Sequence, residues 1–424
     1  MKKIAFIDLM FRWPPSGGAT TDLKEVISSL SERGYPVKLF IAHFEDYLPR
    51  GRIDVSLPFD VERISFNKYS FNRKTLPSKF ARAVEKYKPD IVFIGDGYNM
   101  KPFLLEGLRG YKTILRFYAY EVLCYTYNLI NNKEENCDNN IFIDIEKCKR
   151  CKFPSFPAIK GFLDVYLGLD KRGDLFRLLN IQEILASGAF SSAYPKKASR
   201  LISNASQIIV YNEMTKSLLA GINRNINVFP SGVDTKRFKP LERQKSKKKV
   251  ILMPGRISFK PKGFHIMEEV CRMLLKERED FLFLCTADED MVIKKYESPL
   301  DNHIVFLNWV DQSKLHIVYN FADICVVPST WYEPFGITAV EAMACGKPVV
   351  ASRAGGLAGI VKNEETGFLV EPSNIDGFYK AVKTLLDDDD MRIQMGKYGR
   401  RRAEESYDWS VIIDNMYIPL IDGM

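Results

Sequence analysis

Short apolar runs alternate with amphipathic stretches along most of the chain. The runs are rich in Val, Ile and Phe and are apolar on both sides, which favours parallel strands buried beneath helices. In the first half, the predicted strands are 3–8, 36–42, 90–94, 113–117 and 207–211. A helix is predicted over 19–33, with Gly34 following as its cap. This alternation predicts a doubly wound α/β sheet.

The same alternation restarts in the second half, where we interpret the polar and basic stretch Pro240–Lys249 as a linker. There the predicted strands are 226–230, 249–253, 281–285, 303–307, 323–328 and 347–352. An apolar-patterned helix is expected from about Trp409. Because 424 residues exceed what one hydrophobic core usually supports, we expect two α/β domains.

The composition, 46% apolar and 27% charged, is that of a globular protein. No apolar run approaches the roughly 20 residues that cross a bilayer. Asp8 interrupts the apolar start of the chain and no cleavage site follows, so we expect a buried first strand and not a signal peptide. The net charge of +8 is spread along the chain, which argues against a nucleic acid partner. We expect a cytoplasmic protein, and keep open a peripheral contact with the inner membrane surface.

The most informative stretch is 328–350, in which a buried strand ends, a loop follows and Phe335-Gly336 opens a short helix. In an open α/β sheet such a loop and helix start face the ligand, and the free N–H groups there favour phosphate. Glu333 lies in the loop, while Glu341 lies inside the helix. A carboxylate at such a place can accept hydrogen bonds from a ribose diol. The plainer alternative is two surface glutamates near a helix start.

Two further loops follow predicted strands. Gly255–Gly263 contains Arg256 and Lys262, a guanidinium fork and a point charge that together suit a diphosphate. Gly17-Gly18 follows the first strand and could pass close to the same ligand. Either loop could also be an ordinary turn. Asp234, in a turn at 231–238, reads as a structural cap.

Taken in order, these pieces resemble the retaining glycosyltransferase family 4. The pieces are SGG at 16–18, SGVDTKRF at 231–238, GRISFKPKG at 255–263, STWYEPFGITAVEAMACGKPVVAS at 329–352, TGFLVEP at 366–372 and YDWS at 407–410. The resemblance implies the GT-B fold, two Rossmann-like domains that face across a cleft, with a closing helix that crosses back to the first. On this basis we expect an acceptor domain at 1–225 with the helix 407–424, and a donor domain at 226–406.

The resemblance also implies roles for these residues in a hexose transfer from a UDP- or GDP-linked sugar to a glycan or lipid-linked acceptor. Glu333 would be a catalytic residue that contacts and positions the transferred sugar, and Glu341 would hold the ribose. The remaining donor-binding positions would be Gly17, Gly18, Arg256, Lys262, Phe335, Gly336 and Ile337. Catalysis would need no cofactor or divalent metal, since basic side chains and a helix N-terminus would neutralise the diphosphate.

Two features depart from the family pattern. Many members have a histidine after the strand that corresponds to 113–117, and Tyr118 occupies that position here, as a candidate catalytic hydroxyl. The glutamate usual after the later glycine pair is absent from Gly355–Gly359. Fine donor specificity is therefore open.

An irregular insert near 124–192 interrupts the first domain, with helices predicted at 160–180 and 181–194. Its four cysteines, with a C-x₂-C end, suit a structural zinc ion. They are Cys124, Cys137, Cys148 and Cys151. One or two disulfides, free thiols and an iron–sulfur cluster are the alternatives.

Three functions compete with a transferase. A sugar phosphorylase would release sugar phosphate when inorganic phosphate is supplied, and an epimerase would need a catalytic pattern that the sequence lacks. A non-catalytic nucleotide- or glycan-binding protein would show no donor hydrolysis. The joint presence of Arg256, Lys262, Glu333 and Glu341 argues against a decayed site.

Overall fold

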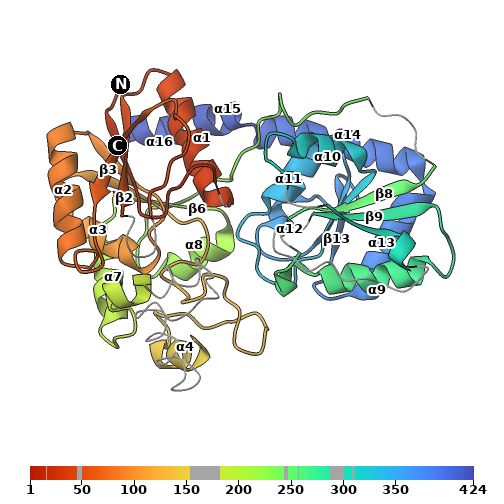
Figure 1. Cartoon of the computed structure of the whole chain (residues 1–424), viewed down its shortest axis with the longest axis horizontal. Coiled ribbons are helices and arrows are strands. Elements are labelled where there is room, and N and C mark those ends of the chain that lie inside the picture. Colours follow the sequence, from red (N-terminus) through yellow and green to blue (C-terminus); the bar gives the residue numbers. More distant parts are fainter. Residues whose placement is uncertain are drawn as a thin grey trace. The chain divides into compact units, whose positions relative to one another are not determined.

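The computed structural model describes residues 1–15, 17–44, 50–152, 182–242, 247–255, 257–286, 300–307 and 310–424 (Figure 1). The chain forms two units, the first comprising Met1–Phe229 with Ile413–Met424 and the second Pro230–Ile412. The division after Phe229 precedes the stretch Pro240–Lys249, which lies within unit 2 and is therefore not the linker that we expected. The closing segment joins unit 1 from Ile413, later than the expected 407.

Unit 1 is built on a seven-stranded sheet in the order β3-β2-β1-β4-β5-β6-β7, and every neighbouring pair is parallel. Its strands are β1 (Ile4–Asp8), β2 (Val37–His43), β3 (Asp60–Ser65), β4 (Ile91–Ile94), β5 (Lys112–Arg116), β6 (Gln207–Val210) and β7 (Ile226–Val228). The strand order reverses beside β1, because Ile4 pairs with Val37 on one side and with Ile91 on the other. In such sheets, ligands bind outside the carboxyl ends of the strands.

Helices cover both faces of this sheet (Figure 1). On one side lie α1 (Gly18–Glu32), η4 (Ile413–Tyr417) and α16 (Ile418–Gly423). On the other lie α2 (Thr75–Tyr87), α3 (Lys101–Gly107) and α7 (Tyr194–Ile202). Other short elements among the described residues include η1 (Tyr98–Met100), α4 (Ile145–Lys152) and α8 (Glu213–Leu219). The closing segment is tied to α1 by the ion pair between Arg33 and Asp414 at 2.5 Å.

The insert is described in part. The predicted helix 160–180 lies outside the described residues. The predicted helix 181–194 is shorter in the structure, with helical residues at 182–187, and a turn then leads to α7. Among the described residues, none of the helices is long and apolar enough to cross a membrane.

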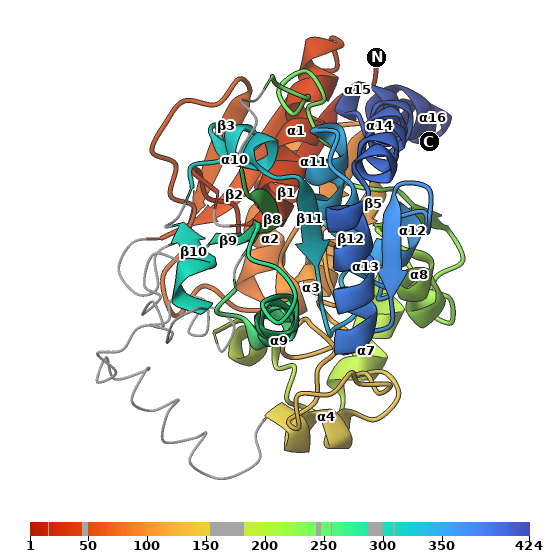
Figure 2. The same cartoon turned by 90° about the vertical axis from the view of Figure 1, so that its right-hand side faces the viewer.

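Unit 2 repeats the architecture with six parallel strands in the order β10-β9-β8-β11-β12-β13. The strands are β8 (Lys249–Met253), β9 (Phe281–Thr286), β10 (Ile304–Leu307), β11 (Ile324–Val327), β12 (Val349–Ser352) and β13 (Gly367–Val370). The helices are η2 (Lys260–Lys262), α9 (Phe264–Leu274), η3 (Leu300–Asn302), α10 (Leu315–Phe321), α11 (Ile337–Ala344), α12 (Leu357–Ile360), α13 (Ile375–Asp387), α14 (Asp389–Ser406) and α15 (Trp409–Ile412). Helices α9 and α13 pack together (Figures 1 and 2).

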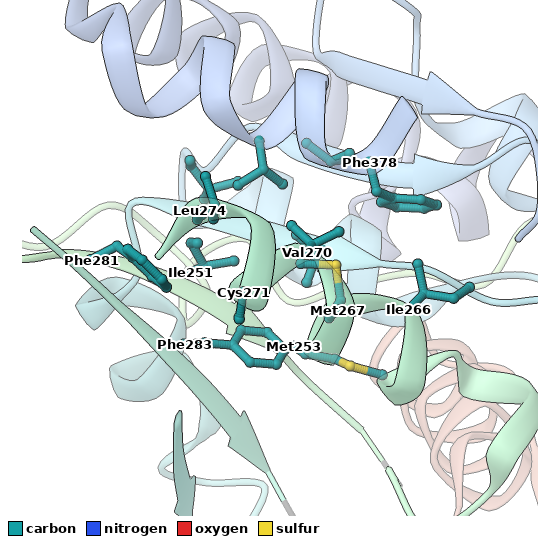
Figure 3. Close-up of a cluster of buried hydrophobic side chains, with 14 of the residues drawn as sticks. Ile251, Met253, Ile266, Met267, Val270, Cys271, Leu274, Phe281, Phe283 and Phe378 are labelled. Carbon is teal, nitrogen blue, oxygen red and sulfur yellow. The ribbon is translucent and has the colours of Figure 1, made fainter. Parts of the chain in front are cut away.

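The core of unit 2 forms where α9 packs on the strands (Figure 3). Ile266, Met267 and Val270 occupy the inward face of α9 at helical spacing, and all three are buried. They meet Phe283 of β9 and Phe378 of α13, both fully buried. Each large apolar side chain buried in this way contributes roughly 1.5–3 kcal/mol relative to exposure. This packing fixes the strand ends from which the site loops emerge.

Three strands differ from the sequence prediction. β3 was not predicted, because this edge strand reads DVERIS and most of its side chains are partly or fully exposed. β13 also escaped prediction. β7 was expected to begin the second domain, but it pairs with β6 and completes the first sheet. Local apolar pattern identifies a strand but does not determine which sheet it joins.

Candidate functional site

An ion pair joins two of the predicted residues in unit 2. Lys262 ends η2, after β8, while Glu333 lies in the loop between β11 and α11. The Lys262 ammonium donates to both carboxylate oxygens of Glu333, at 2.9 and 3.0 Å. Ser329 Oγ donates a further hydrogen bond of 3.0 Å to Glu333 Oε2. The two side chains are 24% and 11% exposed, so the pair is partly screened by solvent.

The loops that carry this pair are bonded to each other through their backbones. Thr330 N donates to Pro261 O at 2.8 Å. Gly263 has φ +84°, and a Cβ there would lie 2.0 Å from Pro328 O, so only glycine allows the approach. Gly355 likewise allows a close approach of two backbone segments, since a Cβ added there would lie 2.1 Å from Glu333 O. The position of Glu333 is thus fixed by the backbone around it.

Trp331 completes this cluster. Its ring packs edge-on against Phe259, with centroids 5.7 Å apart, and Lys262 Nζ lies 5.6 Å from the indole centroid. The indole N–H is buried without a hydrogen-bond partner in the described part of the chain. A cation beside an aromatic face is attracted by its quadrupole, so Trp331 helps to hold the lysine.

The turn into α11 was predicted as a phosphate-binding element. Gly336 precedes the helix, which begins at Ile337, and Phe335 is buried with its ring 6.1 Å from that of Tyr407. The first amides of a helix lack partners within the helix, so they are available to an anion. This confirms the predicted helix start at Phe335-Gly336.

Glu341 lies on α11, as predicted, but it is buried and already has a partner. Tyr319 of α10 donates its hydroxyl proton to Glu341 Oε2 at 2.7 Å. Burial raises the pKa of Glu341 to about 7, against the lowering effects of Tyr319 and then Arg237. Near neutral pH this carboxyl therefore exchanges between its acidic and ionised forms.

Arg256 and Asp234 come from the other predicted motifs. Arg256 lies outside the described residues. Asp234 accepts hydrogen bonds from the amides of Lys236 and Arg237, at 3.0 and 3.1 Å, which confirms its predicted capping role.

Gly17 and Gly18 belong to unit 1, at the start of α1. A Cβ added at either position would meet nothing within 4 Å. The packing of unit 1 therefore does not itself require glycine there.

Tyr118 follows β5 in unit 1, and its ring is buried. Its hydroxyl is also buried, and has no hydrogen-bond partner among the described residues. Burial, and then the charge of Asp22, hold the pKa of Tyr118 well above its ordinary value. The hydroxyl therefore stays protonated and suits hydrogen bonding better than proton abstraction.

Beside it, Arg116 is fully buried, with its guanidinium 4.0 Å from the ring centroid of Tyr211. It also lies 3.6 Å from Asp22, which accepts a hydrogen bond from Tyr211 at 3.0 Å. Aromatic rings and one carboxylate thus surround this cation and stabilise its charge.

Charged side chains that the sequence did not single out gather near the carboxyl edge of the unit 1 sheet. Lys101 and Glu121 form a buried ion pair of 2.6 Å. Asp8 accepts the amides of Met10 and Asp96 at 2.8 and 2.7 Å. Burial, and then the neighbouring Asp96 carboxylate, raise the pKa of Asp8. No local sequence signal marks these partners, because they come from separate segments of the chain.

The four cysteines of the insert are free thiols. Cys148 Sγ accepts an N–H from Asn139 at 3.1 Å, and the Cys124 thiol lies 3.1 Å from the Thr126 hydroxyl. Among the described residues, no set of three or more His, Cys, Asp or Glu side chains is arranged to hold a metal ion. The thiols nevertheless lie near one another, because Cys124, Cys137 and Cys151 all add to the effect of burial in raising the pKa of Cys148 to about 12. Zinc binding stays a prediction.

The structure thus brings Lys262 and Glu333 together and places Glu341 on the helix that follows. The sequence analysis missed their immediate partners Ser329 and Tyr319. Ser329 follows a buried strand, as binding loops do, and could have been found on that ground. Tyr319 lies in α10 without any local signal.

Both the sequence and the fold resemble those of known proteins. Residues 234–402 match the family "Glycosyl transferases group 1". A D-inositol 3-phosphate glycosyltransferase of Pseudarthrobacter chlorophenolicus is 31% identical over 229 residues, which are 50% of this chain and 53% of that protein. An uncharacterized glycosyltransferase of Methanocaldococcus jannaschii is 33% identical over 169 residues, 39% of this chain and 42% of the relative. The chain thus spans about half the length of the curated relatives that it matches.

Among solved structures, Anabaena HepE in complex with UDP superimposes with a TM-score of 0.66. The superposition covers 99% of this chain and all of that one, at 17% identity. At this identity the likeness shows the fold, two parallel-sheet Rossmann-like domains of the GT-B type. Residues 234–402 are therefore a glycosyl transferases group 1 domain, within a chain that has the GT-B fold.

Proposed function

We propose that this chain is a retaining hexosyltransferase that moves a hexose from a UDP- or GDP-linked donor to a glycan or lipid-linked acceptor. The observation that carries the proposal is the Lys262–Glu333 pair beside the start of α11. A cation, a helix N-terminus and a carboxylate are the groups that a sugar diphosphate needs. HepE, with the same fold, is a UDP complex.

In this proposal, the diphosphate lies against Lys262 and the first amides of α11. Arg256 would add a second cation. Glu341 accepts from the ribose hydroxyls when ionised, and Glu333 holds the hexose. Because cations and helix amides take up the leaving charge, the reaction needs no divalent metal.

Transfer then breaks the bond between the anomeric carbon and the diphosphate oxygen. The acceptor oxygen bonds to the same face of that carbon, and its proton passes to the departing phosphate oxygen. The released products are the glycoside and the nucleoside diphosphate. We propose that Tyr118 acts as a neutral hydrogen-bonding group and not as a base.

The first test is a thermal-shift screen against UDP, GDP, ADP and their common sugars, each beside Glu341→Ala. A ligand that binds only the folded protein raises the melting temperature, so one nucleotide should shift the wild type more than the variant. Absence of any shift would count against a nucleotide-sugar enzyme.

The second test follows the anomer first released when the preferred donor is slowly hydrolysed, by proton NMR. Release with the donor's own configuration is expected, with and without EDTA. The opposite anomer would refute retention. Loss of hydrolysis in EDTA with an unchanged melting temperature would refute metal independence, because removal of a structural zinc should lower the melting temperature as well. Sugar phosphate formed on addition of inorganic phosphate would favour a phosphorylase.

A further inference from the structure

The charges of unit 1 are divided unevenly between the two sides of its sheet. On the side of α2, α3 and α7, residues 68–88 hold seven Lys and Arg against the single acid Glu85. Residues 185–204, which include α7, add three basic residues and no acid. On the opposite side, residues 18–33 and 413–424 together hold two basic and five acidic residues. One side is strongly basic and the other weakly acidic.

The exposed basic residues lie on the two outer helices of one layer, and Glu106 of the middle helix α3 pairs with Lys197 at 3.3 Å. Helix α3 packs against both α2 and α7, so the three helices make a single layer (Figure 1). Arg82 and Lys86 on α2, and Lys196 and Arg200 on α7, are all exposed. We call this layer, with the segments 67–74 and 185–193 that precede its outer helices, the basic face.

Exposed apolar side chains lie along one edge of the basic face. Tyr69 is 71% exposed, Phe190 49% and Leu185 39%. Their segments are joined where Arg73 N donates to Ala186 O at 3.2 Å. A single exposed apolar residue is normal on a protein surface. Several exposed apolar side chains beside a cationic surface indicate a binding site.

Helix α4 extends this edge. It is held to the segment before α7 by Ser192, whose Oγ donates to Glu146 Oε1 at 2.8 Å. Just before α4, Ile143 is 68% exposed. The edge therefore presents aliphatic and aromatic groups from three separate segments.

We propose that the basic face docks unit 1 on an anionic lipid bilayer, with Tyr69, Ile143 and Phe190 entering the headgroup region. Each Lys or Arg near a negatively charged leaflet adds to the attraction, while amphipathic and apolar side chains gain by leaving water. The basic face has both the basic residues and the exposed apolar side chains that such binding needs. The inference goes beyond the proposed function, and it would suit a lipid-linked acceptor.

A soluble polyanion such as RNA is the competing partner for a basic face. The exposed aliphatic side chains Ile143 and Leu185 favour the bilayer. They can bury area at an acyl boundary, whereas a phosphate backbone offers them little. The aromatic rings do not decide, since they can also stack on bases.

The test is co-sedimentation of the full chain with vesicles of phosphatidylcholine alone, and of phosphatidylcholine with 30% phosphatidylglycerol. The variant Arg82→Glu/Lys86→Glu/Lys196→Glu reverses three exposed charges of the face. The matched control reverses three exposed charges of unit 2 and changes net charge equally. It is Lys276→Glu/Lys380→Glu/Lys397→Glu. Melting temperatures and nucleotide-induced shifts verify that both variants are folded.

We expect the wild type and the control to bind the anionic vesicles and not the neutral ones. The face variant should bind at least about tenfold more weakly. Tyr69→Ser/Ile143→Ser should also reduce binding, without changing its dependence on salt. Equal binding by the face variant and the control would overturn the proposal. The proposal would also be overturned if the wild type failed to bind anionic vesicles. Preferential binding of a single-stranded RNA of about 20 nucleotides over the vesicles would overturn it as well. The melting temperature of the same preparations is also measured with and without nucleotide. A protein that responds to nucleotide but does not bind vesicles would contradict the membrane proposal and leave the donor proposal intact.

Discussion

The Lys262–Glu333 pair leads to a prediction that runs against the usual effect of removing a binding-site charge. In the empty protein the lysine donates to both oxygens of Glu333, so a diphosphate must compete with that carboxylate for it. Glu333→Gln removes the competing charge, and also removes a negative group beside the incoming phosphates. The amide oxygen of glutamine can still accept from Ser329. We therefore expect the variant to bind UDP, without its sugar, more tightly than the wild type.

The magnitude follows from the exposure of the pair. A hydrogen bond to a charged group contributes roughly 1.5–3 kcal/mol when buried, and an exposed ion pair about 0–1 kcal/mol. With the lysine 24% and the glutamate 11% exposed, we take an intermediate cost of about 1 kcal/mol. That corresponds to about fivefold tighter binding. Sugar transfer should fall at the same time, because Glu333 no longer holds the hexose as a carboxylate.

The assay is isothermal titration with UDP, or with whichever diphosphate the thermal screen selects. Glu371→Gln is the matched control, since it removes an exposed charge of the same unit, paired with Arg353 at 3.0 Å. In a Lys262→Met background, Glu333→Gln should lose most of its effect, which separates competition for the lysine from direct repulsion. Unchanged or weaker UDP binding by a folded Glu333→Gln protein would refute the reasoning.

Three further predictions follow from single contacts. UDP binding should strengthen as the pH rises through about 7, where Glu341 ionises. The terminal phosphate of UDP also loses a proton at about pH 6, so Glu341→Gln should reduce the pH dependence to the part that comes from the phosphate; a profile unchanged in the variant would exclude Glu341 as a source. Gly263→Ala should lower the free energy of unfolding by roughly 2–4 kcal/mol in urea denaturation, through strain and the clash with Pro328. Gly255→Ala has a similar φ but open space, so an equal loss there would contradict the clash. Metal analysis should find about one zinc per chain, lost in Cys148→Ser; four reactive thiols and no metal would contradict a zinc site.

The raised pKa of Glu341 also leads to a prediction for how the free energy of unfolding changes with pH. Its pKa rises on folding, from the ordinary 4.5 to about 7, so the folded chain holds this proton more tightly than the unfolded chain. Its contribution to stability is therefore complete below pH 4.5 and lost as the pH rises to about 7. Ligand binding and stability should thus respond to this carboxyl in opposite directions.

The sequence predicted most strands because buried parallel strands are short, continuous apolar runs. It failed at β3, where an exposed edge strand needs no such run, and at β7, whose pairing with β6 is a tertiary choice. The motif at 328–350 gave the helix start and both glutamates, since loop and helix chemistry are local. The partners were not predictable in this way. Nothing within ten residues of Glu341 indicates that Tyr319 donates to it.

The Lys262–Glu333 pair also explains how a diphosphate could bind beside a carboxylate. An ionised and unpaired carboxylate close to a diphosphate site would repel the ligand. Glu333 is instead neutralised by Lys262. The opposition to the ligand is thereby reduced, while the first amides of α11 still offer their partial positive charge. When the diphosphate takes over Lys262, Glu333 becomes available to the hexose. The diphosphate of the donor thus releases Glu333 from Lys262, and Glu333 can then contact the sugar of the same donor. A donor that lacks the second phosphate should therefore form a weaker contact with Glu333.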